Sequence, residues 1–378
     1  MNFVVFSDDW GVHPSSCQHI FRSLARESRV LWVNTIGMRP PRLSVADFKK
    51  AVRKVATMLR APSRSQQGQA EVDPVRVCAP LMTPYRRPRW LRALNNASVV
   101  RAVRRGAKDL GMGEFCSVTT VPNVGGVIPA LGARRVVYYC VDDFSEWPGL
   151  DRQSILSMEE ETLRSVDRVV CTSQALHDRF RSRFPSILLS HGVDLELFAE
   201  LPRVEHACIR AIPPPRVGYY GLFDGRSDVE LLRSVAQALP EVSFVITGPV
   251  EGDTAPAKLG PNVHFTGPVP YRELPSVVTG WSACLLPYRL NDLTRKINPL
   301  KLREYVATGK PVVSSPLPEA RKLEPHLRVA DSPADWIKDI QDAIRGTWAP
   351  DREAIHRFLE PDAWSRKAAE FLAFCEAA

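Results

Sequence analysis

The chain has 378 residues, of which 44% are hydrophobic and 24% are charged, and it carries a formal net charge of +8 at pH 7. This length exceeds one ordinary hydrophobic core and predicts two domains of a globular protein. No apolar run approaches the ~20 residues of a membrane-spanning helix, and the scattered cysteines, without a C-x-x-C pair, argue against a disulfide framework or structural zinc. The N-terminus MNFVVFSDDWG has no basic region of a signal peptide, so we expect a cytoplasmic protein.

Short β-branched runs alternate with helical patterns through the first half of the chain. Between the first two runs, Ser15 or Ser16 is placed to cap a helix with one apolar face. The predicted strands are NFVVFS, RVLWVN, VRVCAP, EFCSVTT, RVVYYCVD, RVVCTS and SILLSHG. Such alternation predicts an α/β architecture with parallel sheets.

The composition changes at 201–216, where three consecutive prolines follow a mixed polar run. A stiff segment of this kind is typical of a domain boundary. The alternation then restarts with VGYYG, VSFVITG, VHFTG, ACLLPY and PVVSS. We therefore predict an N-terminal domain over 1–200, a linker over 201–216 and a second domain over 217–354. The last helical stretch, 355–378, is predicted to pack back on the first domain.

Two segments carry basic residues and no acidic ones, at 49–64 and at 86–108, and the second includes Trp90. The sequence leaves three interpretations open. The segments are basic helix faces in solvent, a nucleic-acid surface that neutralises phosphates, or a patch that binds anionic membrane headgroups while Trp90 enters the interface.

The stretch INPLKLREYVATGKPVVSS predicts a short, well-bounded helix followed by a strand. Asn298 is a good N-cap, Pro299 suits the first helical position, and Gly309 stands where a helix ends in a left-handed turn. Lys301 adds a charge to the first turn, whose N–H groups suit a phosphate, and Glu304 follows three residues later. In isolation the pair is equally explained as a surface ion pair.

The pattern PLKLREYVATGKPVV resembles the nucleotide-sugar motif of bacterial GT-B glycosyltransferases, and a weaker resemblance covers about 135–344. It implies an α/β fold in which two Rossmann-like domains face each other across a cleft. It also implies that Lys301 meets the diphosphate of a sugar nucleotide and Glu304 its ribose, with Asn298 nearby. Enzymes of this type need no metal or other cofactor, because helix dipole and basic residues stabilise the leaving diphosphate.

One departure from the family pattern concerns mechanism. Retaining members carry a glutamate eight residues before the position of Glu304, and this chain has Lys296 there. The pattern is closer to bacterial exopolysaccharide transferases such as the xanthan glucuronosyltransferase, which invert and use an aspartate base. Asp142 and Asp143 directly follow a strongly apolar strand, so we predict one of them as the base, with Asp143 favoured. Either residue can instead cap the next turn.

Further candidate residues follow the first strand of each predicted domain. Asp9, Trp10 and Gly11 are predicted to form an acceptor loop, with Asp8 and Asp9 as a second candidate pair for the base. Gly221 allows close backbone approach, and Arg226 is a candidate clamp on the diphosphate because its fork fits two oxygens. A glycine-rich turn with a solvated arginine explains these two residues equally well.

Together these features predict a glycosyltransferase that moves a sugar from a nucleoside-diphosphate sugar, with UDP as the expected nucleotide, to a lipid-linked or polysaccharide acceptor. The basic segments would hold it at the inner face of the plasma membrane. Two alternatives remain: a sugar-nucleotide epimerase, and a non-catalytic nucleotide-sugar-binding subunit of a polysaccharide assembly. A nucleic-acid role is disfavoured because the basic segments hold few aromatic residues.

Overall fold

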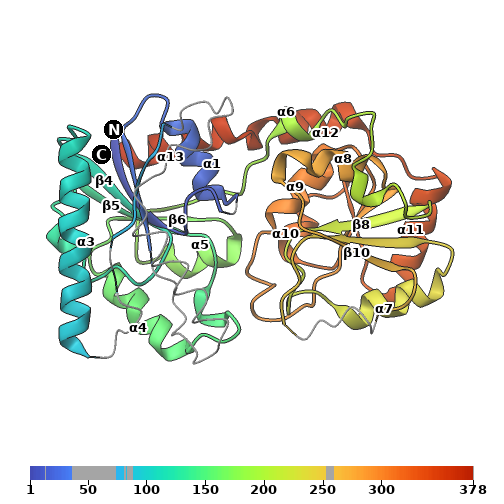
Figure 1. The fold of residues 1–378 in the computed structure, drawn as a ribbon, viewed down its shortest axis with the longest axis horizontal. Coiled ribbons are helices and arrows are strands. Elements are labelled where there is room, and N and C mark those ends of the chain that lie inside the picture. The colour runs from blue at the N-terminus through green and yellow to red at the C-terminus, as the bar shows by residue number, and fades with distance from the viewer. Residues whose placement is uncertain (13, 36–73, 81, 83–87, 253–258, 378) are drawn as a thin grey trace. The chain divides into compact units, whose positions relative to one another are not determined.

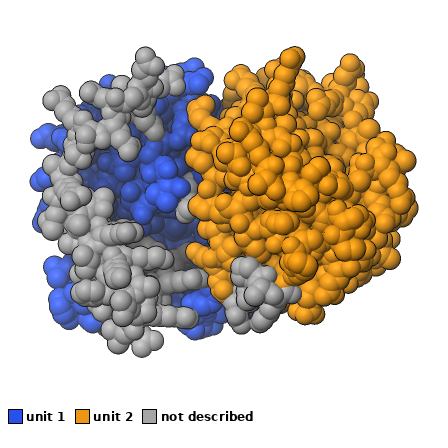
Figure 2. Space-filling model, turned by 45° about the vertical axis from the view of Figure 1, so that its right-hand side comes forward, with its two compact units in different colours: residues 1–171, 176–189, 368–378 blue, residues 172–175, 190–367 orange. Residues whose placement is uncertain are grey.

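The structure is a computed structural model that describes residues 1–12, 14–35, 74–80, 82, 88–252 and 259–377. It divides into two compact units, shown in Figure 2. Unit 1 comprises 1–171, 176–189 and 368–378, and unit 2 comprises 172–175 and 190–367. The predicted linker 201–216 falls within unit 2, where Ala207–Ile209 forms a 3-10 helix. The basic segment 49–64 lies outside the described residues.

Unit 1 contains a seven-stranded sheet with the order β3-β2-β1-β4-β5-β6-β7. Every neighbouring pair of strands is parallel, as the sequence predicted. The strands are β1 (Asn2–Ser7), β2 (Val30–Asn34), β3 (Arg76–Cys78), β4 (Phe115–Thr119), β5 (Arg135–Cys140), β6 (Arg168–Cys171) and β7 (Ser186–Leu188). The central strands are buried on both faces because helices cover them, which explains their near-continuous apolar sequences.

The helices of unit 1 connect these strands. They are α1 (Ser16–Leu24), α3 (Arg89–Asp109), α4 (Arg152–Leu163) and α5 (Gln174–Phe180), with the short 3-10 helices η1 (Ile128–Ala130) and η2 (Phe144–Glu146). The C-terminal helix α13 (Trp364–Glu376) adds Phe371, whose ring lies 5.5 Å from that of Phe21 and 6.4 Å from that of Phe3. Ser15 caps α1, one of the two candidates that the sequence left open. Figure 1 shows α3 as the longest helix of this unit, at its outer edge.

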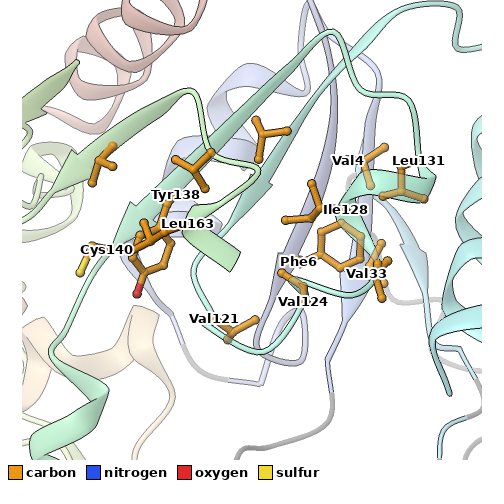
Figure 3. Packing of buried hydrophobic residues seen from close by; sticks show 14 of the residues in the cluster. Val4, Phe6, Val33, Val121, Val124, Ile128, Leu131, Tyr138, Cys140 and Leu163 are labelled. Atoms are coloured by element: carbon orange, nitrogen blue, oxygen red, sulfur yellow. The ribbon is translucent and has the colours of Figure 1, made fainter. Parts of the chain in front are cut away.

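One hydrophobic cluster fills the face of the unit 1 sheet that α3 covers. Figure 3 shows Phe6, Val33, Val124 and Ile128 together, with Tyr138 and Leu163 further along the same face. The phenol of Tyr138 donates a hydrogen bond to Glu159 over 3.0 Å, which satisfies a polar group at the edge of this core.

Unit 2 contains a six-stranded, all-parallel sheet with the order β10-β9-β8-β11-β12-β13. The strands are β8 (Arg216–Tyr220), β9 (Ser243–Thr247), β10 (Val263–Gly267), β11 (Ala283–Leu286), β12 (Val312–Ser314) and β13 (Arg328–Val329). The first five match the predicted runs, whereas β13 has only two residues and was not predicted. A two-residue strand carries too little periodicity to be recognised.

Besides the helix that carries Lys301 and Glu304, the sequence of unit 2 predicts helices near Asp228–Leu239, Tyr271–Thr279 and Ala334–Ile344. They are observed as α7 (Val229–Ala238), the pair η5 (Tyr271–Glu273) and α8 (Leu274–Thr279), and α11 (Pro333–Arg345). The others are α6 (Leu195–Phe198), α9 (Leu300–Ala307), α10 (Pro318–Arg321), α12 (Arg352–Leu359), η3 (Ala207–Ile209) and η6 (Glu360–Asp362). The side chain of Asp228 caps α7, as expected from its position before the helix.

Candidate functional site

The candidate site lies at the carboxyl ends of the strands in unit 2. Strands β8 and β11 are neighbours in the sheet although β9 and β10 lie between them in the chain. The connections therefore run to opposite sides of this pair, and ligands of open α/β sheets bind at such a point. The loops after β8 and β11 and the N-terminal part of α9 all supply side chains here, as the contacts below show.

Helix α9 begins one residue later than predicted. Its N-cap position is occupied by Pro299, and the side chain of Asn298 does not cap the helix. Instead the Asn298 amide donates to the carbonyl of Thr172 over 2.9 Å, and its oxygen accepts from Arg303 over 3.1 Å. The predicted capping role of Asn298 was therefore wrong, because its side chain forms these two buried hydrogen bonds instead. Gly309 has φ +68, which confirms the left-handed turn after the helix.

The ammonium group of Lys301 lies between two tyrosines. It donates to the phenol oxygens of Tyr219 over 2.6 Å and Tyr288 over 3.2 Å, and it stands 4.0 Å from the ring centre of Tyr219. The Tyr219 hydroxyl itself donates to the carbonyl of Leu222 over 2.6 Å, so its oxygen is turned to accept from the lysine. Among the described residues, Lys301 forms no ion pair with a carboxylate. Lys301 is therefore a cation whose hydrogen-bond partners are phenols and not carboxylates.

The pKa values around Lys301 follow from this arrangement. Burial lowers the pKa of Lys301, and the nearby Arg226 guanidinium lowers it further, while Tyr288 opposes the shift. Burial would raise the pKa of Tyr288, but Lys301 and Arg226 outweigh it and lower that pKa. The cluster therefore holds two cations, Lys301 and Arg226, and one carboxylate, Asp224, beside the two phenols.

Arg226 stands at the edge of the same cluster. Its Nε donates to Asp224 over 2.9 Å, and its guanidinium lies 5.8 Å from the ring centre of Tyr288. Burial alone would lower the pKa of Arg226, but Tyr288 and Asp224 raise it, so the guanidinium stays charged. Arg226 and Lys301 thus both lie next to Tyr288, a proximity that the sequence did not predict.

Glu304 is 3% exposed and lies one turn after Lys301 in α9. Its carboxylate accepts from the phenol of Tyr220 over 2.6 Å and from that of Tyr271 over 2.9 Å. Burial raises the pKa of Glu304, and the two phenols oppose this shift. The surface ion pair that the sequence left open is not formed, because each side chain bonds to tyrosines instead. Tyr271 is half-buried and brings η5 to the carboxylate.

Two glycines bring backbone close to this cluster. Gly221 follows β8 with φ +112, and a Cβ placed on it would lie 2.7 Å from Lys301 Nζ. Gly248 follows β9 with φ +142, and a Cβ there would lie 2.2 Å from the carbonyl oxygen of Gly221. Both positions need glycine for their backbone conformation and for the space they leave. The space that Gly221 leaves without a Cβ is taken by the Lys301 ammonium.

Two basic residues stand just before α9. Arg295 is exposed and Lys296 is half-buried, and the backbone carbonyl of Lys296 accepts from the hydroxyl of Ser173. His191 is buried close to Arg303. Burial and Arg303 lower the pKa of His191 to about 3, so the ring stays neutral.

The predicted catalytic aspartates follow β5 in unit 1. Asp143 is 4% exposed, caps η2 by accepting from the backbone and hydroxyl of Ser145, and lies 3.7 Å from Arg179 Nη1. This is the turn-capping position that the sequence left as the alternative. Asp142 is half-buried, so this residue is the more exposed of the two.

The predicted acceptor loop follows β1, the strand whose neighbour β4 marks the reversal of strand order in unit 1. The ring of Trp10 packs edge-on against that of Trp32 at 4.6 Å, and the guanidinium of Arg22 lies over Trp10 at 5.2 Å. Gly11 has φ +77 and donates to the side chain of Gln18 over 3.0 Å, while the carbonyl of Asp9 accepts from Gln18 over 3.3 Å. Helix α1 thus fixes the loop.

Asp8, part of the second candidate pair, keeps contact with solvent although protein atoms surround much of its carboxylate. It accepts from the hydroxyl of Ser7 over 2.8 Å and from Gln18 over 3.3 Å. Burial and the neighbouring Asp9 raise the pKa of Asp8, and the hydrogen bonds oppose the shift. A raised pKa is a feature of carboxylates that accept protons.

Three further features of the described chain bear on possible sites. In the described part of the chain, no three His, Cys, Asp or Glu side chains form a group that could hold a metal ion. None of its helices is long and apolar enough to cross a membrane. A cavity of about 440 Å³ lies at the amino edge of the unit 1 sheet, and none of the predicted site residues lines it.

Three functional candidates were missed from the sequence, namely Tyr219, Tyr220 and Tyr288. A signal for the first two was present in VGYYG, where paired tyrosines stand at the end of a strand directly before a glycine. Alternation along a strand turns their side chains to opposite faces. The structure shows that one reaches Lys301 and the other Glu304, so both faces of the strand end serve the same helix.

Two Rossmann-like units with all-parallel sheets define the chain as an α/β protein of the GT-B fold, as the comparisons with solved structures also show. Sucrose-phosphate synthase from Thermosynechococcus elongatus superposes with a TM-score of 0.69 at 16% identity, covering 98% of this chain and 97% of that one. HepE of Anabaena in complex with UDP-glucose gives a TM-score of 0.67 at 15% identity, covering 99% of each chain.

Sequence comparisons concern parts of the chain. Residues 214–345 match the family model described as "Glycosyl transferases group 1". Over 200 residues the chain is 28% identical to the "Putative teichuronic acid biosynthesis glycosyltransferase TuaH" of Bacillus subtilis (strain 168). This match covers 49% of the present chain and 50% of TuaH, so the chain spans about half the length of this relative. The family match contains β8, Arg226 and the whole of α9.

Proposed function

We propose that the protein is a glycosyltransferase that moves a sugar from a nucleoside-diphosphate sugar, with UDP as the nucleotide, to a lipid-linked or polysaccharide acceptor. The observation that carries the proposal is the inward-facing ammonium of Lys301, held by two phenols beside the β8–β11 switch point. A diphosphate supplies the negative charge that this cation lacks within the described residues. The family match over 214–345 and the UDP-glucose complex of HepE support the same class of donor.

In the proposed reaction, one hydroxyl oxygen of the acceptor forms a bond to the anomeric carbon as the bond from that carbon to the diphosphate oxygen breaks. The acceptor proton passes to a carboxylate, and the diphosphate leaves with the electron pair of the broken bond. Lys301 and Arg226 would bind the charge that develops on the leaving group. We propose that these cations and the start of α9 make a metal ion unnecessary.

We further propose that the displacement inverts the anomeric centre and that an aspartate of unit 1 is the base. Lys296, in place of the glutamate found in retaining relatives, supports inversion. Three carboxylates are candidates for the base: Asp142 and Asp143 after β5, and Asp8 after β1. Asp143 already accepts two hydrogen bonds from Ser145 and stands near Arg179, whereas Asp142 and Asp8 are more accessible.

For the donor residues, we propose that Glu304 binds the ribose hydroxyls while it keeps its hydrogen bonds to Tyr220 and Tyr271. A carboxylate has about four lone-pair sites, so two phenols leave capacity for a vicinal diol. Gly221 and Asn298 would shape the site, Gly221 by leaving room for the lysine and Asn298 by fixing the chain before α9.

The test is calorimetric titration of the full chain with UDP, GDP, dTDP and ADP. We expect one diphosphate to bind, and Lys301→Ala to weaken it by about 2 kcal/mol, or roughly 30-fold, the contribution of a charged hydrogen bond. Lys338→Ala is the matched control, because Lys338 is an exposed lysine of the same unit in α11. If no diphosphate binds, or if both variants bind alike, the donor site is not at α9.

A further inference from the structure

We infer that the outer face of α3 docks on the surface of an anionic lipid bilayer. This surface belongs to unit 1, and the inference stands independently of the donor site in unit 2. It deepens the proposed function because it would bring the protein to a lipid-linked acceptor. Four features of the helix carry it: geometry, exposed apolar side chains, unpaired basic side chains, and the near absence of acidic residues.

Geometry aligns one set of side chains along the whole helix. Successive residues of an α-helix differ by about 100° around the axis. On this basis six residues fall within a sector of roughly 80°, here named the outer stripe: Trp90, Leu94, Ala97, Arg101, Arg105 and Lys108. From Trp90 to Lys108 the stripe is roughly 27 Å long at about 1.5 Å per residue.

The stripe faces away from the core. The buried residues of α3 are Asn95, Val99, Val103 and Ala107, which occupy the opposite side of the helix. Figure 1 shows α3 at an edge of unit 1.

The first half of the stripe is apolar and exposed. Trp90 is 65% exposed and Leu94 is 59% exposed, one turn apart on the same face. Large apolar side chains at adjacent exposed positions indicate a surface that meets another apolar or interfacial phase. Tryptophan prefers the headgroup region of a bilayer, where its ring is in apolar contact and its N–H meets water.

The second half of the stripe is basic and has no internal partners. Arg101, Arg105 and Lys108 are exposed, and within the part of the chain that the structure describes they form no ion pair or side-chain hydrogen bond. Two other arginines of the helix behave differently: Arg92, on the side opposite the stripe, lies 3.4 Å from Glu161, and Arg104, beside the stripe, donates to the carbonyl of Ala130 over 2.7 Å. The structural contacts of these arginines thus lie outside the stripe and leave its basic residues for an external anion.

Acidic residues are almost absent from the helix. Its sequence, RWLRALNNASVVRAVRRGAKD, holds six basic residues and a single acidic one, Asp109 at the end. A basic row of this length complements the negative surface of a bilayer that contains anionic lipids. Nucleic acid presents a similar charge, but the apolar half of the stripe fits the boundary between headgroups and acyl chains better than a phosphate backbone.

The experiment is co-sedimentation of the full chain with phosphatidylcholine vesicles, with and without phosphatidylglycerol, at low and high salt. We expect binding only to the vesicles with phosphatidylglycerol, and weaker binding at high salt. The double variant Arg101→Gln/Arg105→Gln should lower the partition coefficient about 30-fold, from roughly fivefold per arginine near a charged surface. The matched control Arg26→Gln/Arg181→Gln, with the same change of net charge on exposed residues outside α3, should bind like the wild type.

A second variant, Trp90→Ala/Leu94→Ala, removes the apolar half and should weaken binding without changing its salt dependence. The inference is overturned if the wild type binds neither kind of vesicle, if the control loses as much binding as the α3 variant, or if only a short DNA duplex binds through Arg101 and Arg105. Every variant is also titrated with UDP. Because α3 lies outside unit 2, UDP affinity should be unchanged, so failure of docking and failure of the donor site are distinguished.

Discussion

At the scale of single residues, Lys301 combines two properties that a purely structural lysine would not need. Its ammonium is largely surrounded by protein atoms, and its hydrogen-bond partners are phenols rather than carboxylates. Burying a charge without a counter-ion costs stability, which suggests that the charge is kept for a ligand. Two predictions separate this explanation from a structural one.

The first prediction concerns the pH dependence of UDP binding. Because burial lowers the pKa of Lys301, its ammonium loses a proton at a lower pH than the usual lysine pKa of about 10.4 would give. UDP affinity should therefore fall as the pH rises toward that value, and Lys301→Arg should remove most of the fall, since a guanidinium stays charged. Calorimetry at a series of pH values measures this. Parallel profiles for the two proteins would show that another group is titrating.

The second prediction concerns stability without ligand. Because the pKa of Lys301 is lower in the folded state, protonation of this lysine stabilises the unfolded state more than the folded state. The charge therefore costs stability at neutral pH. That cost is relieved as the pH rises above the folded-state pKa. Lys301→Met should raise the free energy of unfolding by about 1 kcal/mol at neutral pH, and the gain should shrink at alkaline pH. Denaturant unfolding at both pH values tests this, and a destabilised variant would contradict it.

At the scale of elements, the strands were predicted better than the residues that join them. Apolar runs such as VVFS and VSFVIT identify buried parallel strands directly, because both faces of each strand are covered. The start of α9 was misplaced by one residue because Asn298 had two competing partners, a helix end and the Thr172 carbonyl, and only the folded chain decides between them. The tyrosines around Lys301 and Glu304 were missed for the same reason. Their partners, Lys301 and Glu304, lie up to 84 residues away in sequence.

The loop between β5 and η2 gives the third prediction, which separates Asp142 from Asp143. Asp143 caps η2 and lies near Arg179, whereas Asp142 is more accessible. Asp143→Asn should mainly lower stability, by about 1 kcal/mol, because asparagine retains the cap but not the charge. If Asp142 is the base, Asp142→Asn should lower turnover by at least about 100-fold.

UDP release from a UDP-sugar in the presence of a bacterial membrane lipid extract measures this turnover, with UDP affinity as the control. Asp8→Asn is compared in the same assay, since the pKa of Asp8 is also raised. A loss of turnover confined to Asp143→Asn, in a variant of normal stability, would return the role of base to Asp143.

At the scale of the whole molecule, the proposed ligands belong to different units, the nucleotide to unit 2 and the lipid surface to α3 of unit 1. The two units, drawn in different colours in Figure 2, each contain a parallel sheet. A ligand that binds only the folded form of one unit stabilises that unit by mass action, about 2.7 kcal/mol at a concentration of 100 Kd. Each ligand should therefore leave a distinct pattern of protection.

The fourth prediction is that pattern in amide hydrogen exchange. With UDP at 100 Kd, amides of unit 2 that exchange through its unfolding should slow by about 100-fold, including those of β8, β9 and α9. Vesicles with phosphatidylglycerol should instead slow exchange in α3. Lys301→Ala should abolish only the first effect, and Arg101→Gln/Arg105→Gln only the second. If UDP slowed exchange in the sheet of unit 1 as much as in that of unit 2, the donor site would not be confined to the loops after β8 and β11, and Lys301 would not be its centre.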